Sequence, residues 1–257
     1  MEIKKVYGIY FSPTHTTKKV VESIVKGTEK DSESIDITLS WKNMKEYSLK
    51  NDDLLIFGAP VYGGRAPRLI REALNKINGD NTPIILVGVY GNRAYEDFFV
   101  EAQDIFEKNG FRVVGAGAFL GEHSFTTKVA KGRPNFEDLL KGENFGREII
   151  LKIRNLEEIK SMDLPGNRPY KQDMVSRNIA PEPDENCKSC GACVKVCPTG
   201  AIGKNPKDID PSKCILCHAC VRVCKFNSRK VKGEAIKPAI DFLEGKCNDY
   251  KEIEIYL

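Results

Sequence analysis

The sequence contains no stretch of about 18 consecutive apolar residues, so it predicts no membrane-spanning helix. The apolar run within residues 3–11 is too short for the hydrophobic part of a secretory signal, and no cleavage site follows it. A formal net charge of +4 is mild and gives no reason to expect binding to nucleic acid. We therefore expect a cytoplasmic protein with neither a membrane span nor a nucleic-acid partner.

Other signatures are missing as well. The glycine-rich segment 115–121 lacks the G-x-G-x-x-G spacing and is expected to reflect close packing within a strand. Trp41, the single tryptophan, lies in a polar stretch and is expected to pack rather than to stack on a cofactor. We see neither a nucleophile paired with a base nor a general acid–base pair, so the sequence predicts no catalytic residue.

Cysteine, by contrast, is concentrated in one stretch. Eight of the nine cysteines lie between residues 187 and 224, in two runs that both read C-x2-C-x2-C-x3-C, and Pro198 follows the first run. Three thiolates on one tight turn can hold three corners of an iron–sulfur cube. The fourth lies on a short helical turn that leads away, so it can reach a second cube.

Three other uses of these cysteines explain less. A structural zinc site needs four ligands, not two matching runs of four. Disulfides require an oxidising compartment, for which the sequence offers no route. The segment 214–218 formally matches the C-x-x-C-H haem attachment motif, but that interpretation leaves the other cysteines unexplained.

This stretch resembles the bacterial two-cluster ferredoxins over about residues 184–228. The resemblance implies a small α+β domain with two [4Fe–4S] clusters whose ligands cross between the runs. One cluster is expected at Cys187, Cys190, Cys193 and Cys224. The other is expected at Cys214, Cys217, Cys220 and Cys197. Metal binding should be coupled to folding of this domain.

The part of the chain before the cysteines alternates apolar runs with helical patterns. Strands are expected at about 3–11, 35–39, 53–59, 83–89 and 112–119, with helices at about 18–25, 68–77, up to 108 and from 135 onward. Such βα alternation predicts a doubly wound, five-stranded parallel sheet with helices on both faces. Ligands of these sheets bind beyond the carboxyl ends of the strands.

Three unusual loops fall at that end of the predicted sheet. The loop 12–17 is rich in hydroxyl groups and precedes a helix, which is typical of a phosphate site, although a simple helix cap with surplus threonines would look the same. Two further loops follow the next buried strands, at 60–67 and 90–95.

Together these features resemble flavodoxin of the short-chain type over about residues 1–158. The resemblance implies FMN, with its phosphate in the first loop and its ring system between the other two. His15 stands where the family's loop usually has glycine, and a left-handed backbone is tolerable for histidine. The implied FMN contacts are Ser12, Thr14, His15, Thr16, Thr17, Pro60, Val61, Tyr62, Gly63, Gly64, Tyr90, Gly91, Asn92, Arg93 and Tyr95.

The whole chain thus resembles the flavodoxin–ferredoxin fusion proteins of anaerobes. We expect an FMN domain at 1–160, a Pro- and Gly-rich linker at 161–183, and a two-cluster domain with a C-terminal tail at 184–257. The tail is expected to hold a short helix at 238–245 and a strand at 252–257. Cys247 is needed by neither cluster, and His123 is expected to be a polar loop residue with some chance of lying near the flavin.

The predicted function is electron transfer between one-electron clusters and FMN, which can hold one or two electrons. The partners would be other redox proteins, and the sequence leaves monomer and homodimer open. Two alternatives remain: a flavin-dependent reductase of a small molecule that is supplied with electrons by the clusters, and a redox-sensing module. Whether the chain is an enzyme is therefore open, and a carrier is the favoured interpretation.

Overall fold

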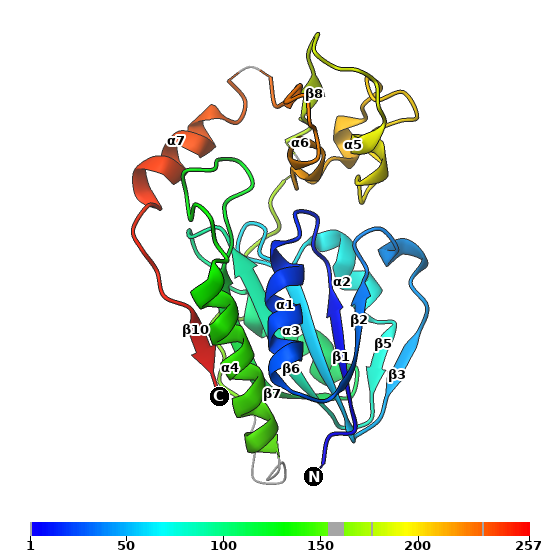
Figure 1. Ribbon diagram of the computed structural model, residues 1–257, viewed down its shortest axis with the longest axis vertical. Coiled ribbons are helices and arrows are strands. Elements are labelled where there is room, and N and C mark those ends of the chain that lie inside the picture. The colour runs from blue at the N-terminus through cyan, green and yellow to red at the C-terminus, as the bar shows by residue number, and fades with distance from the viewer. Residues whose placement is uncertain (1, 154–161, 176, 233) are drawn as a thin grey trace.

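The computed structural model describes residues 2–153, 162–175, 177–232 and 234–257. A central sheet with helices on both faces forms the larger part of the molecule (Figure 1). The cysteine-bearing segment forms a smaller body, which lies beyond one end of the strands (Figure 1). Within the described residues, no helix combines the length and the apolar character needed to cross a bilayer.

The main sheet has the strand order β10-β7-β6-β4-β1-β2. Five of its strands are mutually parallel: β1 (Lys5–Tyr10), β2 (Asp31–Asp36), β4 (Asp53–Pro60), β6 (Thr82–Tyr90) and β7 (Phe111–Leu120). Counted along the chain, these five have the order 2-1-3-4-5, which is the flavodoxin-like arrangement. The expected doubly wound parallel sheet is confirmed.

Two helices cover each face of the sheet. On one face, α1 (Thr16–Gly27) and α4 (Phe136–Ile153) bury Val20, Ile24 and Ile149 against the strands. On the other face, α2 (Arg68–Leu74) and α3 (Phe98–Lys108) belong to the second core cluster. Gly27 allows α1 and α4 to touch, because a Cβ at that position would overlap the backbone of Glu143.

The connection from β2 to β4 differs from the predicted alternation. The second strand begins four residues earlier than expected, and the described chain has no α-helix between β2 and β4. A 3-10 turn, η1 (Trp41–Asn43), and the short strand β3 (Tyr47–Leu49) take that place. β3 pairs with β5 (Ile77–Gly79), so the helix expected to reach residue 77 ends at Leu74.

The cysteine-bearing body is built from short elements. Strands β8 (Glu182–Pro183) and β9 (Arg229–Lys230) pair antiparallel. Helices α5 (Ala192–Lys195) and α6 (Ala219–Arg222) each contain the third cysteine of one run. A 3-10 turn, η3 (Pro211–Lys213), precedes the second run. The two halves are therefore alike in structure as they are in sequence.

The tail returns to the large sheet. Helix α7 (Lys237–Lys246) is followed by β10 (Glu254–Tyr256), which pairs antiparallel with β7 and places Ile255 beside Gly117. The predicted tail helix and strand are both present, but the strand makes the sheet six-stranded. The proposed domain limits stay a prediction, and the chain's last strand lies with the first 160 residues rather than with the cysteines.

A cavity at the strand ends and two cysteine sites

The loop after β1 leaves the N-terminus of α1 without a side-chain cap from any described residue. His15, at the N-cap of α1, has a left-handed backbone with φ 63°, and no side chain caps the helix in the described structure. Ser12 Oγ accepts a hydrogen bond from the Lys18 backbone N–H at 3.0 Å, which closes the loop. The Thr17 hydroxyl is buried and has no hydrogen-bond partner in the described chain. The loop therefore offers unpaired donors to an anion.

The loops after β4 and β6 are held in tight, partly left-handed conformations. Tyr62 and Arg65 exchange backbone hydrogen bonds around Gly63 and Gly64, which both have positive φ. Asn92 is also left-handed, and its side-chain amide donates to the backbone carbonyls of Cys247 and Asp249 at 2.6 and 2.8 Å. This second loop is therefore braced by the C-terminal tail.

All three loops open onto one cavity of about 620 Å³, which we call the strand-end cavity. Nine of the predicted FMN contacts line it: Thr14, Thr16, Pro60, Val61, Tyr62, Gly63, Tyr90, Gly91 and Arg93. Six do not: Ser12, His15, Thr17, Gly64, Asn92 and Tyr95. Ser12, His15, Gly64 and Asn92 shape the loops, and the Tyr95 hydroxyl bonds to Glu254 and Tyr256 of β10.

Tyr62 and Tyr90, which are both among the implied FMN contacts, differ in burial. Tyr90 is 3% exposed, and burial raises the pKa of its hydroxyl to about 12. Tyr62 is partly exposed at the cavity wall, yet burial, with a smaller contribution from Cys217, raises the pKa of its hydroxyl well above the usual value. Both side chains thus remain neutral phenols at physiological pH and bring no charge to the cavity wall.

The eight clustered cysteines divide between two small cavities. Cys197, Cys214, Cys217 and Cys220 line one, which we call the proximal cluster site. Cys187, Cys190, Cys193 and Cys224 line the other, which we call the distal cluster site. Each set combines three cysteines of one run with the last cysteine of the other run, the crossed grouping that the ferredoxin resemblance implies.

The two groups of four cysteines match the ligand number of two four-iron clusters. In a four-iron cube each thiolate binds a different corner, so the sulfurs stand apart. All nine cysteines are free thiols, which leaves the eight available as ligands.

The proximal site is the drier of the two. Cys217 and Cys220 are each 8% exposed, and burial raises the pKa of both thiols to about 12. At the distal site, burial acts to raise the pKa of Cys224, but hydrogen bonds from Ser228 outweigh it and the pKa is lowered. Buried thiols of this kind become good ligands when a metal takes the place of the proton.

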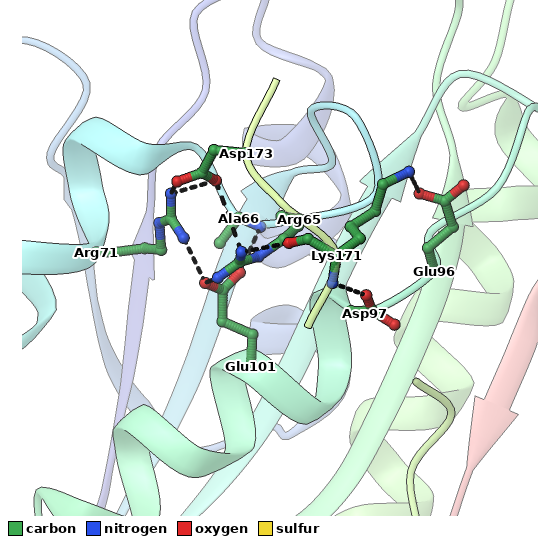
Figure 2. A network of polar contacts seen from close by, with 8 residues as sticks. All are labelled: Arg65, Ala66, Arg71, Glu96, Asp97, Glu101, Lys171 and Asp173. Carbon is green, nitrogen blue, oxygen red and sulfur yellow. Dashed lines mark hydrogen bonds and ion pairs between the residues drawn. The ribbon is translucent and has the colours of Figure 1, made fainter. Parts of the chain in front are cut away.

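The connector between the two bodies is tied to the large domain. Lys171 N–H donates to Asp97 at 2.8 Å, and Asp173 accepts from Arg71 at 2.6 Å (Figure 2). Arg71 also donates to Glu101, which in turn binds Arg65 (Figure 2). We call this group, Arg65, Arg71, Asp97, Glu101 and Asp173, the connector clamp. Side-chain contacts thus hold the segment 162–175, which we call the strap, against the large domain, and the linker limits 161–183 stay a prediction.

The strap contributes directly to the cavity. Met174 lines it and lies against Gly63, where an added Cβ would come within 2.5 Å of the Met174 sulfur. Two further contacts join the bodies: Trp41 Nε1 donates to Pro198 O at 2.8 Å, and Arg222 pairs with Glu122 at 2.5 Å. Trp41 is therefore a packing residue, as expected, and it contacts the residue that follows Cys197.

Several lining residues lie outside the predicted FMN contacts, and among them the sequence pointed only to His123 as a residue near the flavin. His123 packs on Gly91 and lines the cavity, and burial, with a smaller effect of Arg93, lowers its pKa to about 4. Phe125 lies between His123 and His218, with ring centroids 5.2 and 5.0 Å away. Pro238, Ala239 and Phe242 of α7 form an apolar roof. Only three-dimensional contacts bring these segments together, so no local motif marks them.

A family model described as a 4Fe-4S dicluster domain matches residues 186–228. The match spans the whole segment that holds the eight clustered cysteines. An uncharacterized protein of Methanocaldococcus jannaschii is 25% identical over 153 residues, which cover 57% of this chain and 98% of that protein. A subunit of the ion-translocating oxidoreductase complex of Buchnera aphidicola is 29% identical over 83 residues, which cover 32% of this chain and 46% of that subunit.

Among solved structures, an archaeal flavodoxin aligns with a TM-score of 0.39 and 16% identity, over 59% of this chain and 99% of its own. Flavodoxin 1 from Bacillus cereus aligns with a TM-score of 0.40 and 18% identity, over 61% of this chain and all of its own. The assignment of the flavodoxin-like fold rests on the strand order and connections of the sheet itself.

Proposed function

We propose that this chain transfers electrons between FMN, held in the strand-end cavity, and two [4Fe–4S] clusters, held at the proximal and distal cluster sites. The observation that carries the proposal is the position of Cys217. This cysteine belongs to the proximal site and also lines the strand-end cavity, together with Ile215 and Leu216. One cluster ligand is therefore part of the wall that would face the flavin.

The residues of the first loop fit a phosphate group. The Thr14 and Thr16 hydroxyls lie 3.4 Å apart at the cavity, and the buried Thr17 hydroxyl lacks a partner in the described chain. The uncapped end of α1 adds backbone N–H groups and the positive end of the helix dipole. Bound FMN would supply a carrier for one or two electrons.

The remaining residues would position the ring system and exclude water. Tyr62 and Tyr90 give the cavity aromatic walls from two loops, and Met174 covers Gly63 from the strap. Phe125 and the α7 residues Pro238, Ala239 and Phe242 add apolar wall to the cavity. The chain thereby holds the flavin site and the proximal site against each other, and the low dielectric of such a site strengthens the influence of nearby charges on reduction potentials.

The relative from Buchnera supports the redox assignment, because it is named as part of an oxidoreductase complex. This chain spans less than half of that relative, so the relative's partners and complex are not carried over. We propose other redox proteins as partners and a reducing compartment, the cytoplasm, as the location, because eight free thiols must stay available for iron.

The test is anaerobic rapid mixing of the loaded protein with a reductant that acts on the clusters. Bleaching of the flavin absorbance should follow cluster reduction with a first-order rate that does not change over a wide range of protein concentration. A rate that rises in proportion to concentration would show transfer between molecules and would reject the internal relay. Absence of flavin or of cluster iron from the anaerobically purified protein would reject the proposal at an earlier stage.

A reductase of a small apolar molecule is a second candidate, favoured by the apolar roof of α7. In that case Phe242→Ala, which removes a side chain of the roof and enlarges the cavity, should change the set of small acceptors that the reduced protein turns over. It should leave the internal cluster-to-flavin rate nearly unchanged.

A further inference from the structure

The two cluster sites occupy different positions relative to the strand-end cavity. The proximal site shares Ile215 and Cys217 with that cavity, whereas no residue lining the distal site lines it. Cys217 is buried, while Cys190 at the distal site is exposed to solvent. The molecule therefore has one cysteine site facing inward and one facing outward.

The surface around the distal site carries unpaired positive charge. Lys188 lines the site, Lys225 directly follows its ligand Cys224, and Lys195 ends α5, the helix that contains its ligand Cys193. All three are exposed, and none forms an ion pair in the described chain. Nearby acids are largely neutralised, since Asp184 pairs with Lys230 and Glu182 pairs with Lys232, although Glu185 remains exposed.

An apolar group lies among these charges. Phe226 is 45% exposed and lines the distal site beside Lys188. An exposed aromatic ring surrounded by like charges is typical of a transient docking surface, in which the ring supplies contact area and the charges guide encounter. A partner that fits this surface carries acidic side chains around its own redox centre.

We propose that the distal cluster site is the port at which the chain exchanges single electrons with an acidic iron–sulfur carrier protein, and that the proximal site lies between this port and the flavin. The inference rests on the proposed function and adds the order in which electrons pass through the two cluster sites. Each electron that the reduced partner loses is gained first at the distal site. Two such electrons, with protons from solvent, are needed to reduce one flavin fully.

The experiment uses the loaded full-length protein and, as the probe, a reduced acidic two-cluster ferredoxin. Lys188→Glu combined with Lys225→Glu reverses two charges at the port. Lys237→Glu combined with Lys246→Glu makes the same change in net charge on α7, beside the roof of the strand-end cavity, and also breaks the ion pair between Lys237 and Glu234. Iron content and low-temperature electron paramagnetic resonance spectra establish that both variants keep their clusters.

At low salt, the port variant should be reduced at least tenfold more slowly in the bimolecular step, and high salt should shrink that difference. The α7 variant should stay within twofold of the unchanged protein, and the internal first-order bleaching should be the same in all three. A slower bimolecular step in the α7 variant, or no slowing in the port variant, would overturn the inference. Bleaching that depends on protein concentration in the unchanged protein would instead reject the proposed function.

Discussion

The two cysteine sites have the same spacing in the sequence but different surroundings in the fold. Both short helices begin at a left-handed residue, Gly191 in the first run and His218 in the second. Cys217, the second cysteine of the second run, lies at the strand-end cavity and is buried, whereas Cys190, its counterpart in the first run, reaches solvent. Because burial and solvent access tune the reduction potential of a cluster, two clusters held by the same motif can have different potentials.

The largest expected effect tests whether the two sites are separate clusters with crossed ligands. Cys197→Ser should remove the proximal cluster and leave the distal one, so anaerobic analysis should find about four irons per chain instead of about eight. Paramagnetic resonance should then show one cluster signal. Cys247→Ala is the control, since Cys247 lines neither site and should retain all the iron. Loss of only the distal cluster in Cys197→Ser would contradict the crossed pairing.

The second prediction concerns the loop 12–17, which we propose binds the FMN phosphate. Thr14→Ala combined with Thr16→Ala should weaken FMN binding at least tenfold, because each hydroxyl bonded to a charged group contributes about 1.5–3 kcal/mol. Riboflavin, which lacks the phosphate, should bind the variant and the unchanged apoprotein equally well. Equal loss for both flavins, measured by fluorescence titration, would place the phosphate elsewhere.

The third prediction tests what holds the proximal site over the cavity. Glu101→Gln leaves Arg65 and Arg71 without their buried carboxylate and should cost about 3 kcal/mol in the free energy of unfolding. It should also expose the strap to protease and slow flavin bleaching. Arg168→Gln is the matched control, because its ion pair with Asp104 is exposed and contributes about 0–1 kcal/mol. Urea unfolding with equal losses in both variants would contradict the account of the connector clamp.

The smallest effect concerns pH. The pKa of His123 falls from its usual value to about 4 in the folded chain, so the unfolded chain binds more protons between pH 6.5 and 4. Stability should therefore decrease as the pH falls from 6.5 to 5, by at most about 2 kcal/mol from this group. His123→Gln should flatten that slope in urea unfolding. An unchanged slope would show that His123 is solvated or already charged in the folded protein.

Local sequence patterns were enough to predict most of the fold and the grouping of the cysteines. The buried strands and the crossed C-x2-C-x2-C-x3-C runs were visible because each is short and self-contained in sequence. The structure differed where contacts are distant: β10 joins β7 across more than half of the chain, and α7 reaches the cavity from the far end. The absent helix after β2 reflects the pairing of β3 with β5, which no local signal announces.

Within the site, the first loop was the easier part, since its hydroxyl groups lie next to each other in sequence. The strap was harder, because a Pro- and Gly-rich composition indicates an extended chain but not where its charges pair. Asp173 binds Arg71 on α2, and Lys171 binds Glu96 and Asp97 in the loop before α3. His123 and Phe125 likewise acquire their place only when the cluster domain packs against the loop that carries them.

The most direct test of the account is an anaerobic crystal structure of the loaded protein, with iron located by its anomalous scattering. The account predicts FMN in the strand-end cavity with its phosphate at the 12–17 loop, and two separate iron centres. The centre bound by Cys197, Cys214, Cys217 and Cys220 should be the nearer one to the flavin. A flavin bound elsewhere, or a nearer centre bound by Cys187, Cys190, Cys193 and Cys224, would contradict it.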